Sequence, residues 1–265
     1  MSNTLIIMLK LSANISLLFT ELPLLDRIKA AADAGFSAIE LHFPYDIPIE
    51  DLLNTIEKTK IKISLFNFPS GDFSNGGPGI ASIAERTAHF RAAVAEAKMY
   101  IEALEPFAIN LLSGSPPSHI NSNHSKKIFI DNLKYAAERL KNTNCLILIE
   151  PINYYDRPNF LINTTSEAIE IIEKSEVKNL KVLFDIYHMY RMGEDILSSI
   201  KINFNYIGHI QFADYPGRKQ PGTGEINFKK IFDLLKKLDY NKWLGAEYIP
   251  LPTTDESLSW LKFFD

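Results

Sequence analysis

The sequence has very little cysteine and no long apolar run. Cys145 is the only cysteine among 265 residues, so no disulfide can form within the chain. This suits a reducing compartment, and the apolar run that follows Cys145 predicts a buried side chain rather than a nucleophile. No stretch reaches the roughly 18 unbroken apolar residues of a membrane span. We therefore expect a cytoplasmic protein with no membrane partner.

Positive charge and several familiar motifs are also lacking. Lys and Arg number 28 against 32 Asp and Glu, a net charge of -4, so there is no basic field to hold nucleic acid. No HExxH or GxSxG occurs, which leaves metalloprotease and α/β-hydrolase interpretations without support. The first apolar run leads into SANISLLFTELP, which lacks the glycine-rich phosphate turn of a doubly wound open sheet.

Eight short apolar runs are present, and they alternate with longer helical stretches. Their near-continuous apolar character is typical of parallel strands that are covered on both faces. A (β/α)8 barrel needs about 250 residues. The sequence therefore predicts an α/β fold, a single TIM-barrel domain over residues 1–265. The expected strands are Leu9–Ile15, Ala38–Phe43, Ile61–Phe66, Phe107–Leu112, Leu146–Glu150, Leu180–Asp185, Tyr206–Ala213 and Trp243–Tyr248.

Helix signals lie between these runs. A first helix begins near Leu24 and should end at Gly35. Thr164 and Glu167 have the spacing of a capping box. Two loops are unusually long, Phe66–Ser82 and Ala213–Asn227, and both follow strands. In a barrel they would lie over the catalytic face.

Three expected strands end in a carboxylate, at Glu150, Asp185 and Glu247, and a fourth carries Gln211 near its end. A single acid after a strand often only caps the next helix. Several acids at one barrel mouth would repel each other, and a divalent cation would relieve that repulsion. Oxygen ligands of these types favour Mg²⁺ or Mn²⁺. The four residues are therefore the expected metal ligands.

Histidines occur beside these groups. His188 follows Asp185 by three residues and is expected to contact substrate from the catalytic side. His209 precedes Gln211 by two, so both point to one face of a strand. His42 is a weaker candidate of the same kind, and a structural role is open for each of them.

The chain resembles the hydroxypyruvate isomerase family, within the wider xylose isomerase-like barrels. The resemblance runs from about Leu11 to Trp260. It rests on SANISLLF near the start, FPYD at Phe43–Asp46, GIA at Gly79–Ala81, IEPIN at Ile149–Asn153, DIYHMYRM at Asp185–Met192, GHIQFAD at Gly208–Asp214 and PGTGEINF at Pro221–Phe228. Relatives of this kind begin near Met8, which implies a start there.

The resemblance implies that the chain interconverts hydroxypyruvate and tartronate semialdehyde, a small sugar-acid or 2-oxo-acid substrate. It also implies that Glu150 and Glu247 transfer the protons and, with Asp185 and Gln211, form the metal shell. Such an isomerisation passes through an enediolate, whose charge a cation stabilises. Nothing in the sequence decides whether the chain forms a homo-oligomer.

Three positions depart from the family pattern. Close relatives carry His-Asn where this chain has Phe66-Asn67, Lys at Ser115 and Lys at Ile249. The residues left to contact the substrate are His188, Asn67, Arg218 and Arg86. Isomerisation or epimerisation of a longer sugar acid such as a 2-oxo-tetronate, a sugar dehydratase reaction, and a sugar-acid binding module without activity are the alternatives.

Overall fold

The computed structural model describes residues 9–263, in which eight parallel strands close into a barrel. Each strand pairs with the next one in the chain, and β8 pairs with β1. The expected eight-stranded barrel is confirmed, and the proposed start at Met8 lies outside the described residues. The strands are β1 (Lys10–Asn14), β2 (Ala38–Leu41), β3 (Lys62–Asn67), β4 (Ala108–Asn110), β5 (Leu146–Ile149), β6 (Leu180–Asp185), β7 (Ile207–Phe212) and β8 (Trp243–Ala246).

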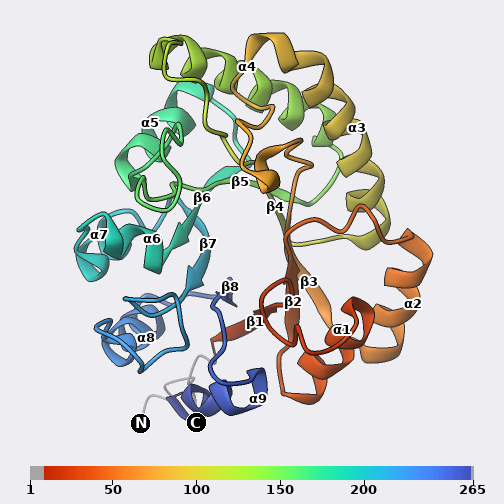
Figure 1. The fold of residues 1–265 in the computed structure, drawn as a ribbon, viewed down its shortest axis with the longest axis vertical. Helices are drawn as coiled ribbons and strands as arrows, with labels where there is room; N and C mark the ends of the chain where they lie inside the picture. Colours follow the sequence, from red (N-terminus) through yellow and green to blue (C-terminus); the bar gives the residue numbers. More distant parts are fainter. Residues whose placement is uncertain (1–8, 264–265) are drawn as a thin grey trace, which may run out of the picture.

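Helices surround the strands on the outside (Figure 1). None of the described helices is long and apolar enough to cross a membrane. The helices are α1 (Leu24–Asp33), α2 (Ile49–Thr59), α3 (Thr87–Leu104), α4 (Ser122–Leu140), α5 (Thr165–Ser175), α6 (Ile186–Arg191), α7 (Ile196–Ile202), α8 (Phe228–Lys237) and α9 (Thr254–Ser257), with short 3₁₀ segments η1 (Phe73–Asn75), η2 (Ala84–Arg86) and η3 (Leu258–Phe263).

Local signals explain where two of the helices begin and end. Helix α1 is followed by Gly35 at φ +91°, a conformation that glycine adopts without steric cost. At the start of α5 the Thr164 hydroxyl accepts a hydrogen bond from the backbone N–H of Glu167. The Glu167 carboxylate reaches the N–H of Asn163 rather than that of Thr164. Half of the predicted capping box is therefore formed, and the other half is displaced by one residue.

The sheet separates two apolar clusters. The larger one fills the space between strands and helices and includes Ile147 and Ile149. Leu148 belongs to a smaller cluster with Leu65, Ala108 and Leu183. Because successive side chains of a strand point to opposite faces, this smaller cluster occupies the barrel interior.

Cys145 lies in the larger cluster with 3% of its surface exposed, as expected. Burial raises the pKa of its thiol to about 12, so the side chain stays protonated and unreactive. Its role is packing.

The same alternation brings the chemical groups to one end of the barrel. Leu148 and Leu183 face the interior, so residues two positions later, Glu150 and Asp185, face it as well. Gln211 and Glu247 lie at the corresponding ends of β7 and β8. Period-two geometry thus places four polar side chains above an apolar floor.

Candidate active site

A cavity of about 340 Å³ opens at the carboxyl ends of the strands. Leu65, from the interior apolar cluster, lines its wall, together with Phe73 and Ser74 from the loop after β3. The predicted site residues that line it are Asn67, Glu150, His188, Gln211, Arg218 and Glu247. Asp185 is 1% exposed and lies against two of them, His188 and Arg218.

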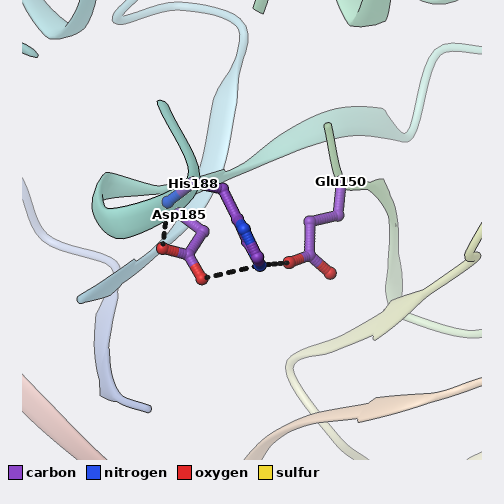
Figure 2. Close-up of side chains that lie close together, drawn as sticks. All are labelled: Glu150, Asp185 and His188. Carbon is purple, nitrogen blue, oxygen red and sulfur yellow. Dashed lines mark hydrogen bonds and ion pairs between the residues drawn. The ribbon is translucent and has the colours of Figure 1, made fainter. Parts of the chain in front are cut away.

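Glu150, Asp185 and His188 form a compact buried group (Figure 2). The His188 Nε2 atom lies 3.8 Å from Glu150 Oε1 and 3.7 Å from Asp185 Oδ2. One ligand atom from each residue falls within 4.8 Å of the other two, so the three could hold one metal ion. His188 is therefore close enough to be a ligand as well as a substrate contact.

Asp185 performs two tasks with its two oxygens. Oδ1 accepts backbone N–H bonds from Tyr187 at 2.8 Å and His188 at 3.2 Å, which caps α6. Oδ2 faces the Nε2 atom of His188 and lies 3.7 Å from Arg218 Nη2. The helix-capping role and a place in the polar cluster therefore occur together in this one side chain.

Glu247 approaches this group from β8. Its Oε1 accepts from Arg218 Nη2 at 2.9 Å and lies 3.2 Å from His42 Nε2. The same Arg218 nitrogen also reaches Asp185, so it joins the carboxylates of β6 and β8. His42, a minor candidate in the sequence, is thus directly at the site.

The two glutamates have opposite pKa shifts. Burial, followed by the negative charges of Glu247 and Asp185, raises the pKa of Glu150 well above its usual value. Burial also opposes ionisation of Glu247, but Arg218 and His42 together lower its pKa to about 2. The two carboxyl groups therefore differ in acidity, Glu247 being the stronger acid and Glu150 the weaker one.

Gln211 is oriented from below by Glu40, a fully buried acid on β2. Glu40 Oε2 accepts from Gln211 Nε2 at 2.7 Å, and its Oε1 lies 2.6 Å from His209 Nε2. With its amide nitrogen fixed in this way, Gln211 leaves its Oε1 buried and without a hydrogen-bond partner. Buried acceptors are rarely left unpaired in native proteins. An oxygen held free beside three acids fits a metal ligand.

The donor set therefore fits a hard divalent cation. Glu150, Asp185, Gln211 and Glu247 offer only oxygen, which suits Mg²⁺ or Mn²⁺ rather than a thiolate-preferring metal. Burial and then the charges of Glu247 and Asp185 raise the Glu150 pKa, and Arg218 offsets only part of this effect. His188 belongs with Glu150 and Asp185 to the described group whose ligand atoms lie within 4.8 Å of one another, and that group does not include Glu247.

Amide side chains hold the charged groups in place. Asn110 Nδ2, on β4, donates to Glu150 Oε2 at 2.9 Å and to Asn67 Oδ1 at 3.1 Å. Asn153 Nδ2 lies 2.6 Å from His188 Nδ1. An amide nitrogen can only donate, so Nδ1 accepts and the ring proton of neutral His188 lies on Nε2, facing the carboxylates. Burial lowers the His188 pKa, which favours that neutral form.

Hydrogen bonds from Arg86 hold the loop over the cavity, residues 68–83. Arg86 donates to Asp72 Oδ1 at 2.8 Å and to the carbonyl of Gly79 at 3.0 Å. Arg86 does not line the cavity. The structure thus brings Asn67, His188 and Arg218 to the site but leaves Arg86, the fourth expected substrate contact, in a role within the loop.

Sequence reasoning missed four residues of the site, namely Glu40, Asn110, Asn153 and Arg157. Glu40 carried a signal, because an acid inside the apolar strand AIEL is costly to bury without partners. The others carried none. Asn110 and Asn153 are ordinary strand-end and loop residues, and Arg157 lies in a polar loop.

Comparison with known proteins agrees with this geometry. The family described as the xylose isomerase-like TIM barrel matches residues 28–264. Hydroxypyruvate isomerase of Escherichia coli (strain K12) is 42% identical over 254 residues, covering 96% of this chain and 98% of that protein. A 2-oxo-tetronate isomerase of Cupriavidus necator is 33% identical, with coverages of 96% and 97%.

Among solved structures, a Brucella melitensis protein described as an AP endonuclease of family 2 has a TM-score of 0.93 at 32% identity. The match covers 96% of this chain and 98% of that one. The resemblance to hydroxypyruvate isomerases is confirmed. Matched over nearly its whole length in sequence and in fold, the chain belongs to the xylose isomerase-like TIM-barrel family.

Proposed function

We propose that this protein is an isomerase that interconverts hydroxypyruvate and 2-hydroxy-3-oxopropanoate. The observation that carries the proposal is the pair of buried glutamates, Glu150 and Glu247, which approach one cavity from β5 and β8. The 42% identity to a hydroxypyruvate isomerase supports the choice of substrate. Such a reaction needs one group that removes a proton from carbon and another that returns one.

The chemistry moves a carbonyl by one carbon. A carboxylate takes a proton from C3, giving an enediolate, and a carboxyl group returns a proton to C2, while the hydroxyl proton passes from the C3 oxygen to the C2 oxygen. Arg218 and His42 lower the pKa of Glu247 to about 2, whereas burial raises that of Glu150, so their opposite shifts suit a base and an acid. In the reverse direction their roles exchange.

Neighbouring residues orient the reacting groups. Asn110 fixes the Glu150 carboxyl, and the Nε2 proton of His188 faces the region where substrate oxygens would lie. The loop at residues 68–83 places Phe73 and Ser74 on the cavity wall, where they exclude water. Asn67 and Arg218 offer further hydrogen bonds to a bound acid.

Glu150, Asp185, Gln211 and Glu247 would hold Mg²⁺ or Mn²⁺. A bound cation would supply positive charge for the enediolate and would balance the three acids. The free Oε1 of Gln211 supports this assignment.

A four-carbon substrate is the second candidate. The cavity of about 340 Å³ exceeds the needs of a three-carbon acid, and the 2-oxo-tetronate isomerase of Cupriavidus necator is 33% identical. Phe66, where close relatives carry His, packs in the larger apolar cluster and does not line the cavity, so this exchange does not decide between the two substrates. A longer substrate would use the extra length of this cavity.

One assay separates the candidates. Purified protein is supplied with hydroxypyruvate or with four- to six-carbon sugar acids and ketoses, with and without Mg²⁺ or Mn²⁺. Turnover of hydroxypyruvate with the highest kcat/KM is expected, together with uptake of solvent deuterium at the product carbon. A higher kcat/KM for a 2-oxo-tetronate would make that acid the substrate instead of hydroxypyruvate. Equal turnover with and without metal would contradict the proposed metal site.

The proposal also includes the compartment and the binding partner of the protein. A buried free cysteine is compatible with the reducing cytoplasm. The partner is a small sugar acid or 2-oxo acid, and self-association into a homo-oligomer is open to a direct measurement of mass in solution.

A further inference from the structure

Two arginines and two histidines are among the described residues that line the cavity, and three of these four side chains already face an acid. His42 and Arg218 both contact Glu247, and His188 lies between two carboxylates. Arg157, in the loop after β5, forms no ion pair with any acid in the described part of the chain, residues 9–263. Asp156, the acid beside it in the chain and on the same cavity wall, pairs with Arg191 instead.

The contacts of Arg157 hold its guanidinium without neutralising it. Nη2 donates to the carbonyls of Phe73 at 2.5 Å and Gly77 at 3.0 Å. The guanidinium carbon lies 4.0 Å from the centroid of the Phe73 ring, a cation–π distance. Within residues 9–263, Nε is buried and has no hydrogen-bond partner, as is also true of Arg218 Nε. A donor that is desolvated and unsatisfied costs free energy unless a ligand completes it.

Acidic side chains on the rest of the cavity surface would repel an anion. Glu150, Asp185 and Glu247 gather at one side, and only part of their charge is offset by Arg218. A negatively charged substrate therefore needs a cation of its own in the wall. Arginine suits this task because its planar group binds a carboxylate through directed hydrogen bonds.

We propose that Arg157 binds the carboxylate of a 2-oxo-acid substrate and so selects acids over neutral ketols at this site. The proposal rests on the proposed isomerase function for the identity of the substrate class. Arg157 also links the β5 side of the cavity to the loop at residues 68–83 through Phe73 and Gly77. One side chain thus binds the carboxylate and holds the loop that forms this wall of the cavity.

The test must separate carboxylate binding from a purely structural tie to the loop. Arg157→Gln removes the charge, and Arg157→Lys keeps it. Arg86→Gln is the matched control, because Arg86 holds the same loop through Asp72 and Gly79 but does not line the cavity. Ligands are pyruvate and hydroxyacetone, which differ in a carboxylate against a hydroxymethyl group.

Calorimetric binding in Mg²⁺-containing buffer, with hydroxypyruvate kinetics beside it, gives the readouts. Arg157→Gln should weaken pyruvate binding and raise the KM for hydroxypyruvate by ~10- to 100-fold, as expected for a hydrogen bond to a charged group. Hydroxyacetone binding should change by less than about 3-fold, since it lacks the charge-assisted bond. Arg157→Lys should recover part of the pyruvate affinity, and Arg86→Gln should affect both ligands equally.

Equal losses for pyruvate and hydroxyacetone in Arg157→Gln would overturn the proposal and leave Arg157 as a loop tie. Failure of the wild-type protein to bind pyruvate would overturn it as well. If hydroxypyruvate is not turned over but pyruvate binding still depends on Arg157, the proposed reaction fails and the carboxylate site stands.

Discussion

Two groups of buried acids occupy the barrel, and they differ in how their charge is balanced. Glu40 is 0% exposed, and both of its oxygens contact buried side chains, His209 and Gln211. At the mouth, Glu150, Asp185 and Glu247 are buried almost as deeply. There, Asp185 and Glu247 share Arg218, Glu150 accepts a hydrogen bond from Asn110, and Gln211 adds an oxygen that has no partner within residues 9–263.

Burial alone therefore does not mark a reactive acid. Glu40 also lines the cavity, but both of its oxygens have partners, so it acts as support, whereas the charge of the acids at the mouth is only partly balanced. A charge excess held by rigid strands is what a cation or a proton-transfer reaction can use. The contrast predicts that substitutions at the mouth change chemistry and that substitutions at Glu40 change geometry.

The largest effect is expected at the mouth. Glu150→Gln and Glu247→Gln keep the shape of the side chain and one oxygen but lose the proton carrier. Each change should lower turnover by at least ~10²-fold. Thermal stability of the metal-free protein should not fall in Glu150→Gln, because the change removes a charge that two neighbouring acids repel. Steady-state kinetics and thermal melts measure both.

The double variant sharpens this prediction. Residues that act as a unit are non-additive, so Glu150→Gln with Glu247→Gln should cost much less than the product of the single losses. Wild-type-like turnover in both single variants would refute the two-glutamate mechanism and would make the mouth no different from the Glu40 group.

Glu40 gives the next largest effect, and its character should differ. Glu40→Leu leaves two buried donors unpaired, which should lower the free energy of unfolding by about 2–5 kcal/mol. It also frees the Gln211 amide, so Mn²⁺ binding should weaken by ~10- to 100-fold, as for other residues that orient metal ligands. Urea unfolding and calorimetric titration with Mn²⁺ provide the two measurements.

Glu40→Gln is the control for this change. Its amide oxygen can still accept from Gln211, and its amide nitrogen can donate to His209 Nε2 in the tautomer that carries the ring proton on Nδ1. Most of the metal affinity should therefore return. Equal metal affinity in Glu40→Leu and the wild type would show that Gln211 needs no support.

Metal removal tests the charge excess directly. If the mouth binds Mg²⁺ or Mn²⁺, a cation at 100 times its Kd should stabilise the protein by about 2.7 kcal/mol relative to chelator-treated protein. Gln211→Ala should reduce this gain, and part of any lost activity should return at higher metal concentration. A melting temperature that is the same with chelator and with metal would contradict the metal site.

The smallest effect concerns pH. Burial, with the charges of Glu247 and Asp185, raises the pKa of Glu150, so its contribution to stability is present below the unfolded pKa of ~4.3 and is lost as pH rises through the folded pKa. The metal-free protein should lose stability from about pH 5 upward, and Glu150→Gln should flatten the slope. Thermal melts at several pH values measure it, and an unchanged slope would assign it to other groups.

Glu247 contributes to stability in the opposite pH range. Its pKa is lowered to about 2, so its contribution to stability is present above ~4.3 and disappears as pH falls toward 2. Glu247→Gln should therefore lose less stability between about pH 4 and pH 2 than Glu150→Gln, which keeps Glu247, in the same series of melts.

Periodicity predicted the strands well because each apolar run is buried on both faces, and strand β6 matches its expected bounds, Leu180–Asp185. The gathering of the acids at the strand ends could be predicted as well, because parallel strands end on one side of the barrel. Contacts across the barrel could not be predicted from the sequence. Glu40 meets His209 only because β2 faces β7 across the interior, which depends on barrel closure and register. The positions of Arg86 and Arg157 depend on loop paths that carry no periodic signal.

The Glu40 carboxylate also constrains a residue on β8. A Cβ atom added to Gly245 would lie 2.0 Å from Glu40 Oε1, so no side chain fits there while Glu40 is present. The two positions should therefore have evolved as a pair: a relative with alanine or a larger residue at the position of Gly245 should carry a shorter residue at the position of Glu40. A designer who wishes to reshape the floor of this barrel would have to exchange both together, and Gln211 would then need a new partner.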